Sequence, residues 1–173
     1  MEEYIKQLKA TYENELYYFS LIGCMTLIDT CAALNSTTGE TNKTLFKKWY
    51  EDYLPQYLQR NLNEAISFSA DECYKFRCRL LHQGRTEIDA DSMNYSLKSG
   101  KIAFRIGAGT FHCCNFEGTF YLDIKMFMDD VISGVLKWIE DTKTDNNVIL
   151  NKSRMIKISN VSPSGNRPGT YIC

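Results

Sequence analysis

The amino-acid sequence predicts a mainly α-helical protein, a helical bundle with a small β-hairpin inserted before the last helix. Apolar residues recur at helical spacing over residues 3–34 and again over residues 123–142, as they do on the buried face of an amphipathic helix. Residues 101–107 and 118–125 instead alternate between apolar and polar side chains, which is the period of a half-buried strand. Glycines between these two runs favour a hairpin, although the second run also fits a loop that leads into the last helix.

The composition is that of a globular protein of ordinary domain size. The chain has 173 residues, of which 44% are apolar and 24% are charged, and this is enough to bury one core. Twenty basic residues against twenty-one acidic residues leave a formal net charge of −1. A protein that coats nucleic acid without specificity usually has a larger basic excess. Any contact with RNA therefore has to come from a local basic patch.

The cysteines and the N-terminal sequence predict a cytoplasmic protein. Seven cysteines are an odd number, scattered along the chain, and without a leading hydrophobic segment they indicate reduced thiols. The first nineteen residues are acidic and amphipathic, unlike a signal peptide. No apolar run is expected to approach the roughly 18 residues that a membrane helix needs. We therefore expect no membrane association.

Capping and helix-breaking residues predict where the helices of residues 1–66 begin and end. The N-terminal apolar pattern predicts one long helix, or two helices that join near Gly23. After a loop rich in turn residues, Thr44 is the expected N-cap of a helix over residues 45–54. Pro55 interrupts or ends that helix, because proline lacks the backbone N–H that a helix interior uses. A turn or short helix over residues 56–66 is expected next.

A third helix has clear signals at both ends. Ser69 is a favourable N-cap, and Asp71 and Glu72 occupy the first turn, where the helix dipole favours negative charge. Gly84 is expected just past the last turn, in the left-handed conformation that commonly ends helices. The last turns of this helix are basic, and on a purely structural interpretation these cations only compensate the dipole.

The domain organisation follows from this order of elements. Residues 1–145 are predicted to form the helical domain. Residues 146–173 are predicted to form a C-terminal tail, rich in Ser, Asn, Pro and Gly, with one short strand over residues 154–159.

The basic end of the third helix carries the residue types that chemistry on RNA needs. Arg79 and His82 are three positions apart and are neighbours on one face of a helix, whereas Arg77 lies five positions before His82 and flanks it. A neutral imidazole can take the proton from a ribose 2′-hydroxyl, and a guanidinium can stabilise the charge on the phosphorane. Two copies of this helix facing each other across a dimer would make a better cleft than one.

The segment "FRCRLLHQGR", residues 76–85, resembles the Arg-x4–6-His motif of the HEPN superfamily, here with four residues between Arg77 and His82. The resemblance implies a compact helical bundle that often forms homodimers with the motifs face to face. Many such proteins are metal-independent endoribonucleases of toxin–antitoxin, abortive-infection and antiviral systems, and others bind nucleotides without cleavage.

The resemblance also implies roles for individual residues. Arg77 and His82 would be catalytic, and Arg79 and Arg85 would bind the substrate phosphate, with no metal or cofactor. The expected partners are RNA or a nucleotide, a second copy of the chain, and an antitoxin-like protein. Cys78 departs from the pattern, because active members usually have a polar residue directly after the arginine. A catalytically inactive RNA-binding, nucleotide-binding or protein-interaction module of the same fold is therefore the alternative.

A zinc site and a calcium loop are further interpretations of the sequence. The thiols and imidazoles of Cys73, Cys78 and His82, with the His112-Cys113-Cys114 cluster, could bind zinc, but no C-x2-C pair is present. Buried thiols are the favoured interpretation. The acidic residues 87–91 resemble part of a calcium loop, but they lack its glycine and its distal glutamate, and a solvated loop is favoured.

A cysteine nucleophile is disfavoured on electrostatic grounds. Cys78 and His82 are four residues apart and could form a nucleophilic pair, but the C-terminal end of a helix disfavours a thiolate.

Overall fold

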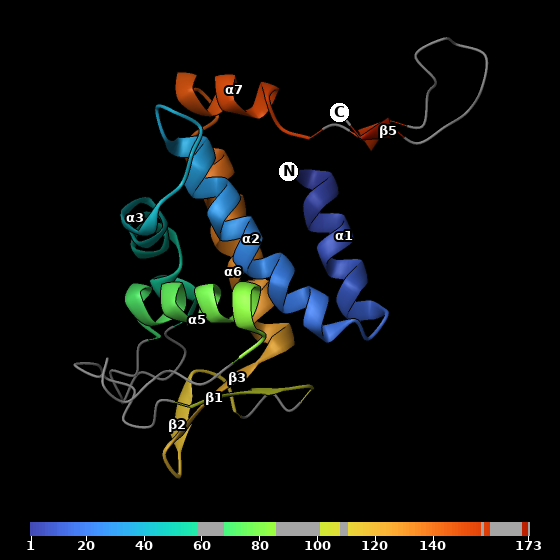
Figure 1. Cartoon of the computed structure of the whole chain (residues 1–173), viewed down its shortest axis with the longest axis vertical. Coiled ribbons are helices and arrows are strands. Elements are labelled where there is room, and N and C mark those ends of the chain that lie inside the picture. The colour runs from blue at the N-terminus through green and yellow to red at the C-terminus, as the bar shows by residue number, and fades with distance from the viewer. Residues whose placement is uncertain (59–67, 86–100, 108–110, 157, 160–170, 173) are drawn as a thin grey trace.

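The computed structural model describes residues 1–58, 68–85, 101–107, 111–156, 158–159 and 171–172. The protein is mainly helical, as the sequence predicts, with a small three-stranded sheet before the last two helices. Figure 1 shows the sheet at one end of the molecule and the helices stacked above it.

The first two helices pack side by side around a break that the sequence analysis placed wrongly. Helix α1 spans Glu2–Glu13 and helix α2 spans Tyr17–Asn35. The chain turns at Glu15, whose φ is 60°. Gly23 lies within α2, where a β-carbon would come within 2.7 Å of Leu8 Cδ1. This glycine therefore allows α1 and α2 to approach closely and does not separate two helices.

The third helix packs against α2, and the short fourth helix packs against the last long helix. Helix α3 spans Lys43–Tyr53, and its N-cap is Asn42, whose side chain accepts a hydrogen bond from the backbone N–H of Leu45 at 3.0 Å. The prediction that Thr44 caps this helix was wrong by two residues. Pro55 ends α3 and begins the short helix α4, Pro55–Leu58. The rest of the segment 56–66 lies outside the described residues.

Helix α5, Ala70–Gln83, has both of the predicted ends. The Ser69 side chain accepts a hydrogen bond from the backbone N–H of Glu72, and the Glu72 carboxylate accepts one from the backbone N–H of Ser69. This reciprocal pair satisfies two N–H groups that have no partner within the helix. At the other end, Gly84 has a φ of 62° and terminates the helix.

Both predicted strands form, but they pair differently from the predicted hairpin. Strand β1, Ile102–Arg105, runs parallel to β3, Thr119–Asp123. The hairpin is made by β3 with an additional short strand, β2, Cys114–Phe116, so the order in the sheet is β1-β3-β2. A parallel pair needs a connection of about a dozen residues, and the segment that contains β2 supplies it. A hairpin therefore forms in the predicted region, but it joins β2 to β3 and does not join β1 to β3.

The last long helix and the helix after it complete the bundle. Helix α6 spans Ile124–Asp141, as the apolar pattern predicts, and its N-cap is Asp123. Helix α7, Asn146–Ser153, lies in the segment expected to be a tail and packs against α2. Beyond it, strands β4, Ile158–Ser159, and β5, Tyr171–Ile172, pair antiparallel.

The core joins the helices to the sheet through aromatic side chains. The Phe68 ring stacks on Phe120 of β3, with the two centroids 5.5 Å apart, and also contacts Phe76 of α5 and Phe127 of α6. Phe76 in turn contacts Phe104 of β1. The sheet is therefore packed into the same core as α5 and α6, and it supports the side of α5 that faces away from solvent.

Helix α2 is long and apolar enough to span a membrane, by length and composition alone. The expectation that the chain has no apolar run of this length was therefore wrong. This helix has 19 residues, and an 18-residue window of it has a mean hydropathy of 1.4, with half of that window buried inside the protein. Core helices of soluble proteins and N-terminal signal sequences share this length and composition. The cytoplasmic location therefore stays a prediction.

Gly134 allows α6 to approach the end of α3 closely. A β-carbon at this position would lie 2.8 Å from Leu54 Cδ2 and 2.9 Å from the carbonyl oxygen of Tyr53, and the backbone cannot easily yield. We expect Gly134→Ala to lower the free energy of unfolding by about 1–3 kcal/mol in a urea titration, despite the higher helix propensity of alanine. Leu136→Ala, at an exposed position of the same helix, is the control and should change it by less than about 0.5 kcal/mol. Equal stability of Gly134→Ala and the wild type would contradict this packing.

Candidate functional site

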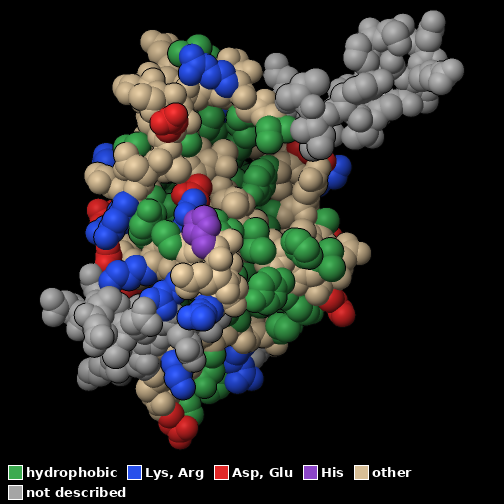
Figure 2. All heavy atoms as spheres, in the orientation of Figure 1, with side chains coloured by type: hydrophobic (Ala, Val, Ile, Leu, Met, Phe, Trp, Pro, Cys, Tyr) green, Lys and Arg blue, Asp and Glu red, His purple; other side chains and the backbone are tan. Residues whose placement is uncertain are grey.

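A shallow groove of about 300 Å³ lies between the start of α3 and the outer face of α5. Its walls include Lys43 from α3 and Lys75, Cys78, Arg79 and His82 from α5. His82 is exposed. Figure 2 shows a histidine at the surface of this face, with lysine and arginine side chains to its left and below and hydrophobic side chains to its right. We call this the α3–α5 groove.

The groove is lined by basic side chains. The ammonium groups of Lys43, Lys47 and Lys75 converge on the carboxylate of Asp71, at 3.1, 3.3 and 3.4 Å. The described residues that line the groove include Lys43, Lys75, Arg79 and His82 and no carboxylate. An anion that enters the groove therefore meets basic side chains.

Arg77 does not line the groove, although the sequence analysis placed it beside His82. Its Nε donates a hydrogen bond to Asp29 Oδ2 of α2 at 2.6 Å, and its side chain is 21% exposed. The guanidinium is also 3.9 Å from the sulfur of Cys78, which does line the groove. Arg77 therefore lies behind the wall of the groove and joins α5 to α2.

The environment of Asp29 explains this ion pair. Burial raises the pKa of the Asp29 carboxyl above its ordinary value, and the hydrogen bond and charge of Arg77 oppose that rise. A half-buried carboxylate needs such a partner, because unpaired buried charge is costly. In this structure, Arg77 therefore neutralises the carboxylate of Asp29.

The remaining predicted site residues lie around the end of α5. Arg79 lines the groove with His82, as their spacing of three predicts. Arg85 is exposed and follows Gly84. The hydroxyl of Tyr18 donates a hydrogen bond to the carbonyl oxygen of Gly84 at 3.4 Å. This contact brings the exposed aromatic start of α2 next to the basic end of α5.

The side chains considered for a zinc site are not gathered into one cluster. Cys73 is fully buried, and burial raises the pKa of its thiol well above the ordinary value. His112 is buried too, and its Nε2 lies 2.9 Å from Asp130 Oδ2 and 3.4 Å from the sulfur of Cys113. Within the part of the chain that the structure describes, no group of three or more His, Cys, Asp and Glu residues is placed to hold a metal ion. The acidic stretch 87–91 lies outside the described residues.

The lysines of α3 and the carboxylate that they share were not predicted from the sequence. Lys43 and Lys47 are four residues apart, so they lie on one face of α3, and this spacing is the only signal that the sequence offers. Which carboxylate they would meet depends on how α3 packs against α5, and no local pattern encodes that.

No protein-family model, no curated protein and no solved structure matches this chain. The resemblance to the HEPN superfamily therefore rests on residues 76–85 alone.

The ion pair between Arg77 and Asp29 leads to a prediction about pH. In Arg77→Gln we expect the pKa of Asp29, followed by the carboxyl ¹³C shift, to rise further above its ordinary value, because the opposing charge is lost. At neutral pH the variant should unfold about 1–2 kcal/mol more easily, since the half-buried carboxylate is ionised and unpaired. This difference should disappear as the pH falls below the wild-type pKa of Asp29, because a protonated carboxyl needs no cation.

Arg85→Gln is the matched control for this prediction. It removes an exposed arginine two residues beyond the end of α5 and should leave the pKa of Asp29 unchanged. An unchanged pKa in Arg77→Gln would show that the ion pair does not form in solution.

Proposed function

We propose that this protein binds RNA through the α3–α5 groove. The observation that carries the proposal is the lining of the groove, which includes Lys43, Lys75, Arg79 and His82 and, among the described residues, no carboxylate. The chain as a whole has a formal net charge of −1, so this gathering of basic side chains is local. A polyanion gains most from such a patch, because each phosphate that meets a cation releases condensed counterions.

Aromatic side chains beside the groove favour RNA over a simple anion. Tyr74 lines the groove, with the ammonium of Lys43 5.9 Å from its ring centroid. Tyr18 and Phe19 are 59% and 62% exposed, and Tyr18 contacts Gly84 at the end of α5. Exposed rings next to cations suit unpaired nucleotides, whose bases stack while their phosphates meet the charges.

Metal-independent RNA cleavage by a HEPN-like homodimer is the second candidate function. The placement of His82 and Arg79 in one groove supports it. The His82 imidazole would take the proton of a ribose 2′-hydroxyl, and the 2′-oxygen would attack the adjacent phosphorus. The bond from phosphorus to the 5′-oxygen would then break, leaving a 2′,3′-cyclic phosphate, and the leaving oxygen would take a proton from water. Arg79 would stabilise the phosphorane, with Arg77 as a positioning residue held by Asp29.

The binding proposal predicts how charge removal changes RNA affinity. We expect the double variant Lys75→Gln/Arg79→Gln to bind a short fluorescein-labelled single-stranded RNA roughly tenfold more weakly in fluorescence anisotropy, with a salt dependence that is shallower by about two phosphate contacts. The reason is that both side chains line the groove.

Lys6→Gln/Lys125→Gln is the control for net charge. These lysines lie on α1 and α6, away from the groove, and their side chains are 79% and 46% exposed. Their removal should change RNA affinity by less than about twofold. If the two double variants weaken binding equally, general charge attraction explains the affinity and the groove does not.

The cleavage candidate makes a separate prediction. The wild type should cut a mixed RNA pool in EDTA and leave 2′,3′-cyclic phosphate ends, and His82→Ala should not cut, while both proteins bind RNA. The products are separated on denaturing gels, and their ends are identified by mass spectrometry. A wild type that binds RNA but does not cut it would leave the binding function alone. Equal cutting by both proteins would point to a contaminating nuclease.

A further inference from the structure

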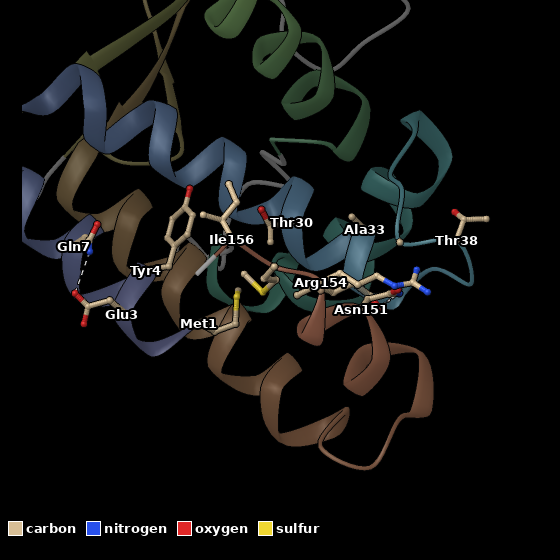
Figure 3. Close-up of a pocket in the computed structure, with 13 residues that line it drawn as sticks. Met1, Glu3, Tyr4, Gln7, Thr30, Ala33, Thr38, Asn151, Arg154 and Ile156 are labelled. Carbon is tan, nitrogen blue, oxygen red and sulfur yellow. Dashed lines mark hydrogen bonds between the residues drawn. The ribbon is translucent and has the colours of Figure 1, made fainter. Parts of the chain in front are cut away.

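A second cavity of the described structure lies away from the α3–α5 groove. It has a volume of about 860 Å³ and lies between α1, the C-terminal half of α2 and the end of α7. None of the residues that line it lines the groove. Figure 3 shows Tyr4, Glu3 and Gln7 at one end and Thr38, Asn151 and Arg154 at the other. We call this the α1–α7 cavity.

The middle of the cavity is aliphatic. Met1, Leu34, Met155 and Ile156 contribute to its wall, and Ile156 is 73% exposed. Exposure of a large aliphatic side chain costs free energy in water, and a ligand that covers it recovers that cost. Methionine side chains adapt to the shape of a flexible chain. The cavity therefore suits an aliphatic body more than a flat aromatic ring system.

One end of the cavity carries a positive charge. Figure 3 shows the Arg154 side chain running along the cavity, with its guanidinium near Asn151 and below Thr38. Among the described residues, no carboxylate forms an ion pair with Arg154. Glu3, at the far end, is bound to Gln7 at 3.0 Å and to Lys6 at 3.8 Å. An anionic head group is therefore favoured at the end of the cavity that carries Arg154 over the end that carries the Glu3 carboxylate.

The backbone of α7 beside Arg154 is held in place before any ligand binds. The side-chain amide of Asn151 donates hydrogen bonds to the carbonyl oxygens of Leu34 at 3.1 Å and Ser36 at 2.8 Å. These bonds fasten α7 to the end of α2, and Arg154 follows directly after α7. Preformed pockets lose less free energy to ordering when they bind.

We propose that the α1–α7 cavity binds a medium-chain aliphatic carboxylate, with its carboxylate on Arg154 and its chain along Met1, Met155 and Ile156. The volume lies within the range of pockets that hold small molecules, and the combination of aliphatic walls with one placed charge is typical of such sites. This proposal is independent of RNA binding, because the two sites share no residue.

Isothermal titration with hexanoate, octanoate and decanoate tests the aliphatic part of the site. Affinity should rise about fourfold for each added methylene, because each one is buried in the cavity. Decanol, which has the same chain without the charge, should bind roughly tenfold more weakly than decanoate. Affinity that does not depend on chain length, or no binding of decanoate, overturns the proposal.

Two variants test where the ligand lies. Arg154→Gln should weaken decanoate binding roughly tenfold and leave decanol binding unchanged, and Arg154→Lys should retain most of the affinity for decanoate. Ala33→Phe places a ring in the cavity, which Ala33 lines, and should weaken both ligands. Arg85→Gln, an exposed arginine outside the cavity, is the charge control. A thermal melt confirms that each variant is folded, and unchanged decanoate binding in folded Arg154→Gln and Ala33→Phe overturns the proposal.

Discussion

The burial of α2 is the constraint on which the rest of this structure depends. Helix α2 packs against α1, α3, α5, α6 and α7, and nine of its residues are buried. Between its exposed first turn and Asn35, α2 has no exposed residue, so nearly all side chains in these turns must be apolar or small. Its single charged residue within these packed turns, Asp29, then requires a partner from a neighbouring helix, and Arg77 of α5 provides it.

This requirement fixes the rotation of α5 and so decides which of its cations reach solvent. With Arg77 held against α2, positions 75, 79 and 82 face outward, toward the start of α3. The spacing of the motif residues already implies this division, because positions five apart on a helix point about 140° away from each other. Arg77 and His82 therefore act on different neighbours in one copy of the chain. Catalysis through both would require movement of α5 or a second copy that completes the site.

What the sequence predicts correctly is mostly local, and what it predicts wrongly depends on packing. Ser69 and Gly84 mark the ends of α5 because capping and left-handed geometry use neighbouring residues only. The break after α1 was missed because the apolar spacing continues across it. Strand pairing was misassigned because β1 and β3 are both apolar and either pairing would bury them. For the site, the pairing of Arg79 with His82 follows from helix geometry, whereas the contribution of α3 depends on tertiary contacts.

The distribution of ion pairs shows why a nearly neutral chain can still have a basic face. Along α3 and α6, lysines pair with aspartates four residues later in the same helix, as in Lys48–Asp52 and Lys125–Asp129. These pairs cancel their charge within one turn and leave little potential at a distance. At the α3–α5 groove, three lysines from two helices instead meet at Asp71, and the described residues that line the groove include no carboxylate. A formal net charge near zero therefore does not reveal where basic side chains gather on the folded chain.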